Sequence, residues 1–132
     1  MPESRVTITA HAGDEIDDAL FDPMYECYRV TVDNSSPFYF IYGGTQDNAT
    51  LGGPSRTRRR AGIGNEDWFV TVFGDGFKTV VDPVEPDIVY SQWQYGGLVR
   101  FDRATGETVD IQPQPAPGED PYRWNWDAPV II

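Results

Sequence analysis

The sequence has little of the chemistry on which many enzymes and metalloproteins depend. Among its 132 residues there is one cysteine, Cys27, and one histidine, His11. A single cysteine excludes a disulfide within the chain, and a single histidine excludes a zinc site built from several histidines. The sequence also contains no Walker-type phosphate loop and no G-x-G-x-x-G fingerprint. We therefore predict no metal ion and no cofactor.

Positive charge is scarce as well. The chain has 10 basic side chains against 21 acidic ones, which gives a formal net charge of -11. Such a surface repels nucleic acid and anionic membranes, so we predict neither as a partner. No apolar run reaches the roughly 20 residues that span a bilayer. The one basic cluster, residues 56–60, has no interleaved aromatic side chains and is predicted to be a solvated loop.

Helical periodicity is also missing. No segment of about ten or more residues repeats its apolar positions every 3.6 residues. The 13 glycines and 11 prolines instead separate short runs of β-branched and aromatic residues. The sequence predicts an all-β chain.

The most informative feature that is present is an internal repeat with a period of about 48 to 49 residues. The matched positions are Asp33 with Asp82, Pro37 with Pro86, Ile41-Tyr42 with Val89-Tyr90, and Gln46 with Gln94. A period of roughly 40 to 50 residues with strand-like content is typical of β-propeller blades.

The repeat also bears on completeness. A closed propeller needs at least about four blades, whereas 132 residues supply about two and a half. We therefore expect the chain to be a β-propeller segment that needs either the remaining blades of a longer chain or self-association. Alone it should be marginally stable or self-associating, because two blades leave sheet edges and a sheet face open.

The predicted segment consists of about two four-stranded antiparallel blades and the start of a third. Residues 1–22 are an N-terminal extension or the end of a preceding blade, with a short strand pattern at 6–9. Residues 23–77 form the first blade, 78–127 the second blade with its exit loop, and 128–132 the start of the third. The expected strands are 27–33, 38–46, 51–59 and 67–73 in the first blade, and 78–82, 87–94, 97–102 and 107–112 in the second.

Antiparallel strand order predicts one functional face. The second-to-third strand connections and the blade-to-blade connections leave the sheets at the same end. Four polar, glycine-bearing or aromatic motifs fall in those connections, where scaffold-held loops commonly carry function. They are Gln46-Asp47-Asn48, Gly74-Asp75-Gly76, Gln94-Tyr95-Gly96-Gly97 and residues 122–127.

These motifs, taken in order, resemble the BNR/Asp-box, sortilin-like propellers. The resemblance covers about residues 24–132 and is carried by residues 39–48, Asp67-Trp68, Gly74-Asp75-Gly76-Phe77, Val81-Asp82-Pro83, residues 87–90, Gln94-Tyr95-Gly96 and residues 123–126. It implies a glycosyl hydrolase-like or xyloglucanase-like protein that acts on or binds a polysaccharide, in an extracellular or periplasmic setting. No signal peptide is recognisable in residues 1–5.

The chain departs from the family pattern in two places. The turn at residues 102–106 lacks the Ser and the Trp of a full Asp-box, and Phe73 replaces the first glycine of G-G-D-G. The resemblance therefore implies a propeller segment without carrying over a catalytic pair.

Two acids are the first candidates for catalysis on the predicted face, Asp47 and Asp75, and Asp127 is a third. Glycoside hydrolysis needs two carboxyl groups about 5 to 9.5 Å apart, one with a raised pKa. The alternative is that each carboxylate caps its own turn by bonding the backbone. Candidate ligand-binding residues are Gln46, Asn48, Gln94, Tyr95, Arg123, Trp124, Asn125 and Trp126.

Two functions remain open at this point. The aromatic side chains of the face could stack on sugar rings, or they could pack between blades. The enzyme hypothesis is a glycoside hydrolase-like propeller with acids at the channel mouth. The alternative is a non-catalytic propeller scaffold that binds a protein or peptide.

Overall fold

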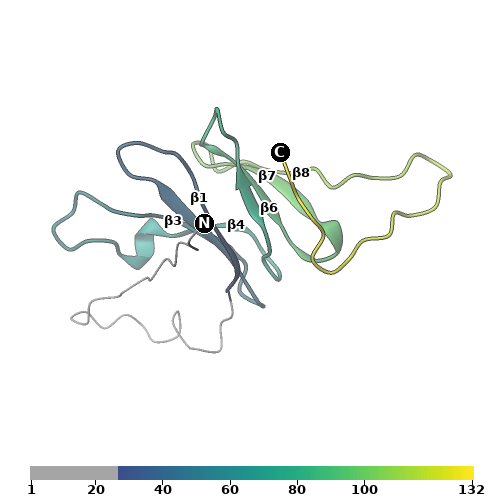
Figure 1. The fold of residues 1–132 in the computed structure, drawn as a ribbon, viewed down its shortest axis with the longest axis horizontal. Helices are drawn as coiled ribbons and strands as arrows, with labels where there is room; N and C mark the ends of the chain where they lie inside the picture. Colours follow the sequence, from purple (N-terminus) through teal and green to yellow (C-terminus); the bar gives the residue numbers. More distant parts are fainter. Residues whose placement is uncertain (1–26) are drawn as a thin grey trace, which may run out of the picture.

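Two four-stranded antiparallel sheets make up the computed structural model, which describes residues 27–132. The first contains β1 (Cys27–Val32), β2 (Phe40–Thr45), β3 (Thr50–Pro54) and β4 (Phe69–Val72). The second contains β5 (Thr79–Val81), β6 (Ile88–Gln92), β7 (Leu98–Asp102) and β8 (Thr108–Asp110). Each sheet follows chain order, and Figure 1 shows them side by side. The all-β prediction is confirmed; the predicted strand at residues 6–9 and His11 lie outside the described residues.

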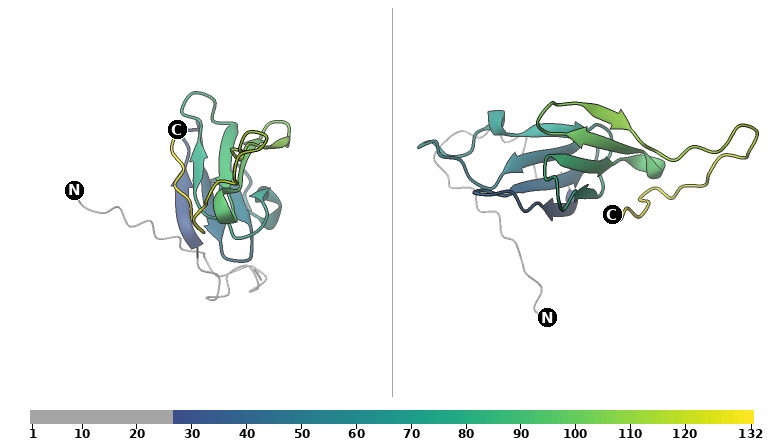
Figure 2. Two further views of the ribbon diagram at one scale, coloured as in Figure 1. Left: turned by 90° about the vertical axis from the view of Figure 1, so that its right-hand side faces the viewer. Right: turned by 90° about the horizontal axis from the view of Figure 1, so that it is seen from above.

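Helical structure in the described part is limited to two short 3-10 turns. They are η2 (Asn65–Asp67) in the β3–β4 connection and η3 (Gln94–Gly96) in the β6–β7 connection. The chain after β8 forms no strand among the described residues and runs away from the sheets before it returns (Figures 1 and 2). No strand is described at residues 128–132, and their role as the start of a third blade stays a prediction.

Strand register reproduces the sequence repeat. In the first sheet Ile41 pairs with Gly53, and in the second Val89 pairs with Phe101. The second pair is the first one moved along the chain by one repeat period, and all other β2–β3 pairs have β6–β7 counterparts at the same offset. On the first strand of each sheet the offset is one residue longer, since Val32 pairs with Ile41 and Val81 with Val89. The two sheets are therefore copies of one unit.

The core lies between the two sheets. Tyr42 of β2 and Val89 of β6 are fully buried there, with Phe101 of β7 beside them. The rings of Phe69 and Phe101, one from each sheet, are stacked with centroids 5.7 Å apart. Burial is also the largest cause that raises the pKa of Tyr42, to about 12. Each sheet thus buries one apolar face against the other, as layered β structures require.

Strand β3 begins earlier than the sequence suggested. Residues 46–54 have the composition of a polar, glycine-containing loop, and the expected third strand was placed at 51–59, whereas β3 is Thr50–Pro54. Its glycines are there for close packing rather than for a turn. A Cβ on Gly52 would lie 2.7 Å from the Phe69 ring, and one on Gly53 would lie 2.5 Å from the Trp68 ring. Aromatic neighbours, supplied by tertiary structure, therefore decide the strand.

Polar side chains also cross the interface between the sheets. The Thr31 hydroxyl donates to the Thr79 carbonyl at 2.8 Å, and the buried Thr71 and Ser91 hydroxyls are 2.7 Å apart. Because buried hydroxyls are costly unless they are hydrogen-bonded, these contacts fix the register of one sheet against the other.

Arg103 of the second sheet forms an ion pair with the first sheet. It follows β7 and reaches the β1–β2 connection, where its guanidinium lies 3.2 Å from Asp33 Oδ2 and 3.8 Å from the centroid of the Phe40 ring. Within its own sheet it donates to Asp87 at 2.6 Å. The Asp33 carboxylate is fully buried and also accepts the backbone N–H of Phe40 at 2.7 Å. Arg103 therefore supplies the cation that this buried charge requires.

Replacing Arg103 should destabilise the protein strongly. Arg103→Ala leaves Asp33 buried without its cation, which should lower the free energy of unfolding by about 3 kcal/mol. Arg103→Lys should recover part of this loss, because it keeps the charge but not the planar fork or the stacking on Phe40. Urea denaturation measures both. Arg58→Ala, in the exposed β3–β4 connection, is the control, and an equal loss in both alanine variants would contradict the role given to Arg103.

Candidate functional site

The four predicted motifs lie at one end of the sheets, which we call the loop end. It carries the β2–β3, β4–β5 and β6–β7 connections (Figure 1). Trp124 and Trp126 of the fourth motif pack against the β6–β7 connection. The opposite end, the turn end, carries the β1–β2, β3–β4, β5–β6 and β7–β8 connections. Hydrogen bonds described below join neighbouring loops within the loop end. The strand order that the sequence predicted thus brings these loops together.

Backbone hydrogen bonds hold the β2–β3 loop against the β4–β5 loop. The Ala49 N–H donates to the Gly74 carbonyl at 2.9 Å, and the Gly76 N–H donates to the Thr45 carbonyl at 3.0 Å. Gly76 is required here, because a Cβ would lie 2.2 Å from Thr50 Oγ1. The two loops of the first sheet therefore form one rigid unit.

Asp75 is the buried acid of this unit. Its Oδ1 accepts the backbone N–H of Asp47 at 2.6 Å, across the two loops. Asp47 itself is exposed and has a left-handed backbone with φ of 58°. The Asp75 side chain thus holds the neighbouring loop in a conformation that non-glycine residues rarely adopt.

The two carboxyl groups interact directly. A hydrogen bond with the Asp75 carboxyl, and then repulsion from its charge, raises the pKa of Asp47 above its usual range. The Asp75 carboxylate is also buried and already accepts the Asp47 N–H. This arrangement suits the bracing of a turn.

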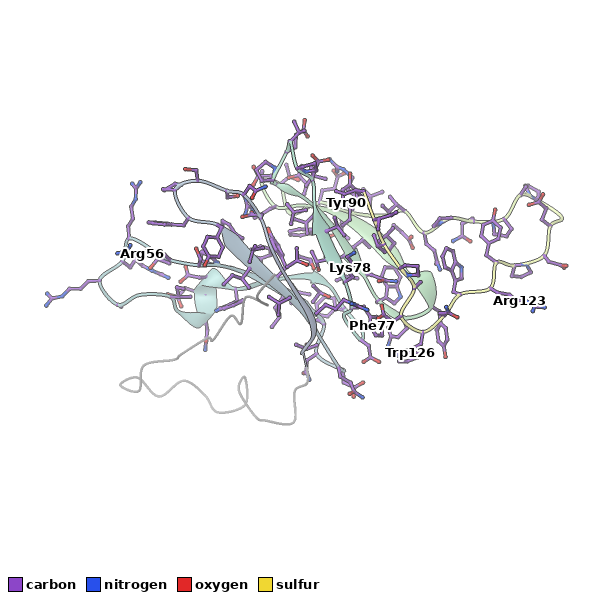
Figure 3. The ribbon with its side chains drawn as sticks, viewed as in Figure 1. Arg56, Phe77, Lys78, Tyr90, Arg123 and Trp126 are labelled. Carbon is purple, nitrogen blue, oxygen red and sulfur yellow. The ribbon has the colours of Figure 1, made fainter. Side chains whose placement is uncertain are left out.

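The second sheet carries an aromatic cluster at the corresponding position. The ring of Tyr95 meets the ring of Trp126 edge to face with centroids 5.0 Å apart, and Trp126 meets Phe77 in the same way at 6.1 Å. The Tyr95 N–H donates to the Trp126 carbonyl at 3.2 Å. Figure 3 shows Phe77 and Trp126 close together beside the sheets. Tyr95 and Trp126 remain 58% and 44% exposed, so a fixed pair of rings faces solvent.

Trp124 packs on the same loop. A Cβ on Gly96 would lie 2.3 Å from the Trp124 ring, and Gly96 has a positive φ of 71°. Only glycine meets both conditions without strain. The Gln112 amide also donates to the Tyr95 carbonyl at 2.9 Å. The segment that leaves the second sheet therefore returns to cover the β6–β7 loop.

The two halves of the loop end are in contact. A Cβ on Gly74 would lie 2.8 Å from Gln94 Oε1, and the Phe77 N–H donates to the Gln92 carbonyl at 3.1 Å. Gln46 and Asn48 are exposed near the acids, and the Asn48 amide donates to the Gln46 carbonyl at 3.1 Å. The acid pair and the aromatic cluster are therefore neighbouring parts of one surface.

Arg123 is placed differently from the other candidates, and Asn125 has no contact with them among the described hydrogen bonds. Both are exposed, and Figure 3 shows Arg123 on the outlying part of the chain, at the end of the long axis opposite Arg56. Asp127, next to Trp126, pairs with Arg29 of β1 at 2.9 Å. The structure thus brings together Gln46, Asp47, Asn48, Asp75, Gln94, Tyr95, Trp124 and Trp126, and it leaves Arg123 apart.

Sequence reasoning missed Gln92 and the equivalence of Asp47 with Tyr95. Gln92 is fully buried at the end of β6, and its amide donates to the Ala128 carbonyl at 2.5 Å, which holds the returning chain. The sequence signal for this role was a polar glutamine within an otherwise apolar strand pattern, which indicates a buried side chain with a hydrogen-bond partner. Asp47 and Tyr95 stand one repeat period apart and both have left-handed backbones, with φ of 58° and 56°. Each follows directly after a repeated glutamine, which could have revealed the match.

No metal centre or membrane segment emerges from the described part of the chain. Residues 27–132 contain no group of three or more His, Cys, Asp or Glu side chains that could hold a metal ion. None of the helices described there is long and apolar enough to cross a membrane. The chain matches no family model, no curated protein and no solved structure.

Removing the Asp75 carboxylate should loosen the acidic loops. Asp75→Ala eliminates the acceptor for the Asp47 N–H, and we expect a loss of about 1–2 kcal/mol in the free energy of unfolding. Asp75→Asn keeps an oxygen acceptor and should lose much less. Chemical denaturation of both variants, beside Asp120→Ala in the exposed segment, provides the measurement. Equal stability of the alanine variant and the parent would refute the bracing role.

The raised pKa of Asp47 predicts a pH-dependent effect of Asp47→Asn. An acid whose pKa is higher in the folded state destabilises that state once it ionises. Asp47→Asn should therefore be more stable than the parent at pH 7. This advantage should shrink as the pH falls through the raised pKa and vanish below the ordinary value of about 3.9. Urea denaturation across this pH range tests the window, and an advantage that stays constant with pH would contradict it.

Proposed function

We propose that this chain is a segment of a BNR/sortilin-like β-propeller and that its loop end binds a carbohydrate. The observation that carries the proposal is the fixed, solvent-facing pair of Tyr95 and Trp126. Rigid aromatic rings beside amide groups are a common design for ligand sites that need apolar contact and a few oriented polar groups.

Support for the propeller comes from the repeated unit. Two four-stranded antiparallel sheets in chain order, related by the sequence repeat, pack face to face. Asp33 and Asp82 each accept backbone N–H groups at the start of the first turn of their sheet. Asp102 does the same between β7 and β8, at the position of the reduced Asp-box. These turns give each unit the same short connections that stacked blades use.

Support for a carbohydrate comes from the shape and charge of the surface. The C–H faces of a sugar ring are apolar, and its hydroxyls pair with amides and carboxylates. Tyr95 and Trp126 offer ring surface, while Gln94, Asn48 and Asp47 lie close by with hydrogen-bonding side chains. With a net charge of -11, the chain suits a neutral glycan better than an anionic one.

Binding fits this geometry better than hydrolysis. Asp75 is buried and accepts the Asp47 N–H at 2.6 Å, and its carboxyl group raises the pKa of Asp47. Neither acid is therefore positioned as an independent partner across a glycosidic bond. Hydrolysis by Asp47 and Asp75 stays a prediction from their place in the loops of the predicted face, and the scaffold that binds a protein or peptide stays the alternative.

Alanine variants of the aromatic pair test the proposal. Tyr95→Ala and Trp126→Ala should each weaken binding to neutral polysaccharides in affinity electrophoresis by about tenfold, the effect of about 1.4 kcal/mol. Trp68→Ala, an exposed tryptophan next to β4, should bind as the parent does. A parent that is not retarded by any neutral polysaccharide, or retardation that survives both substitutions, would overturn the proposal. Release of reducing sugar that Asp75→Asn abolishes would instead favour the hydrolase.

A further inference from the structure

Both sheets have a second face that the described part of the chain covers only in part; on the first sheet, Trp68 covers Gly53. On the first sheet, Val30 and Val32 of the edge strand β1 are 52% and 53% exposed, although both are apolar. On the second sheet, Val109 of the edge strand β8 is exposed, and it lies beside Arg100 and Tyr90 in the strand register. We call the surface of the first sheet that carries Val30 and Val32 the front face. The surface of the second sheet that carries Val109 is the back face.

The strand register shows which residues of the second sheet occupy the same repeat positions as the front face of the first. Val32 pairs with Ile41, and their counterparts Val81 and Val89 in the second sheet pack in the core against the first sheet. The front face of the first sheet is therefore equivalent to the core-facing side of the second sheet.

The back face has the converse equivalence. Tyr90 corresponds to Tyr42, which is fully buried against the second sheet. Val109 pairs with Arg100, and Phe69 pairs with Gly52, which stands one repeat period before Arg100. Val109 therefore corresponds to Phe69, which packs against the core. The back face of the second sheet is therefore equivalent to the core-facing side of the first sheet.

From these two equivalences we propose that the front face of one copy of this chain binds the back face of another, head to tail, with the geometry by which the two sheets pack within one chain. This inference rests on the repeated unit and not on the proposed carbohydrate site. The contact is heterologous, so successive copies would add in one direction and form a ring if the rotation closes.

Charge at the turn end fits the same arrangement. Within the chain, Arg103 of the second sheet reaches Asp33 of the first. One repeat period away, the counterpart of Arg103 is Ser55, next to Arg56, and the counterpart of Asp33 is Asp82. Head-to-tail contact thus sets the arginines of the β3–β4 connection against the acidic β5–β6 turn. Among the described residues no carboxylate forms an ion pair with Arg56, Arg58 or Arg60.

The β5–β6 turn carries two carboxylates, Asp82 and Glu85, that can pair with a cation. Backbone hydrogen bonds from Glu85 and then from Val84 lower the pKa of Asp82, which keeps its carboxylate ionised. Glu85 is exposed beside it. Opposite charges at an otherwise apolar contact fix register and orientation, and they exclude the reversed pairing.

Blocking variants separate head-to-tail contact from other modes of association. Val32→Lys closes the front face and Val109→Lys closes the back face, whereas Thr108→Lys adds the same charge to the other side of β8. Sedimentation velocity on the whole chain should show oligomers for the parent and for Thr108→Lys. Each blocking variant alone should be monomeric, and an equal mixture of the two should form a one-to-one dimer.

The mixture also guards against misfolding, because two unfolded variants cannot restore each other's binding. If a lysine on β1 prevents folding, the double change Val30→Ser with Val32→Ser removes the apolar surface without adding charge. A parent that stays monomeric at every concentration would overturn the proposal. So would a blocking variant that still dimerises alone, since that contact would use one face twice.

Charge exchange tests the orientation. Arg56→Glu and Glu85→Arg should each weaken self-association by about tenfold or more. Mixing the two should restore it, because every contact in the mixture can then pair unlike charges. The parent should also dissociate as ionic strength rises. Association that neither substitution changes would show that the turn ends do not meet, and it would overturn the proposed orientation.

Discussion

The contact between Arg103 and Asp33 is the constraint on which the arrangement of the two sheets depends. Asp33 is a buried carboxylate that also organises the β1–β2 turn through the N–H groups of Ser35 and Phe40. A buried charge is tolerated only with a cation and hydrogen bonds. Arg103 comes from the other sheet, so the second sheet supplies the cation that the buried carboxylate of the first sheet requires. Apolar burial at Tyr42 and Val89 brings the sheets together, and this ion pair selects their alignment.

Alignment of the sheets in turn assembles the loop end. The backbone of the β4–β5 connection bonds back to the first sheet at Thr45 and forward to the second at Gln92. This connection therefore joins the acid pair to the aromatic cluster. Asp47 and Tyr95 occupy the same position of the repeat but carry different chemistry. The repeated unit thus presents a charged turn and an aromatic turn side by side. Together they suit a ligand that has both hydroxyl groups and apolar surface.

Much of the strand layout could be predicted from the chain, because the evidence for it is local. The match of Ile41-Tyr42 with Val89-Tyr90 predicted that β2 and β6 are equivalent strands, and the turn residues predicted the connections. Strand β3 was partly misplaced because Gly52 and Gly53 resemble a loop until Phe69 and Trp68 are packed on them. Nothing near Arg103 in the sequence points to its role, since its partner Asp33 is 70 residues away.

The sequence by itself determined that the chain is all-β, that it contains one internal repeat of a strand-rich unit, and that its polar motifs leave the sheets at one end. Those properties follow from side-chain periodicity and turn chemistry, which act over a few residues. Only the tertiary structure decided that Asp75 braces the Asp47 turn, that Tyr95 meets Trp126, and that Arg103 serves Asp33. Each of these contacts joins residues far apart in the chain, and burial and distance, which set their strength, exist only once the sheets have packed.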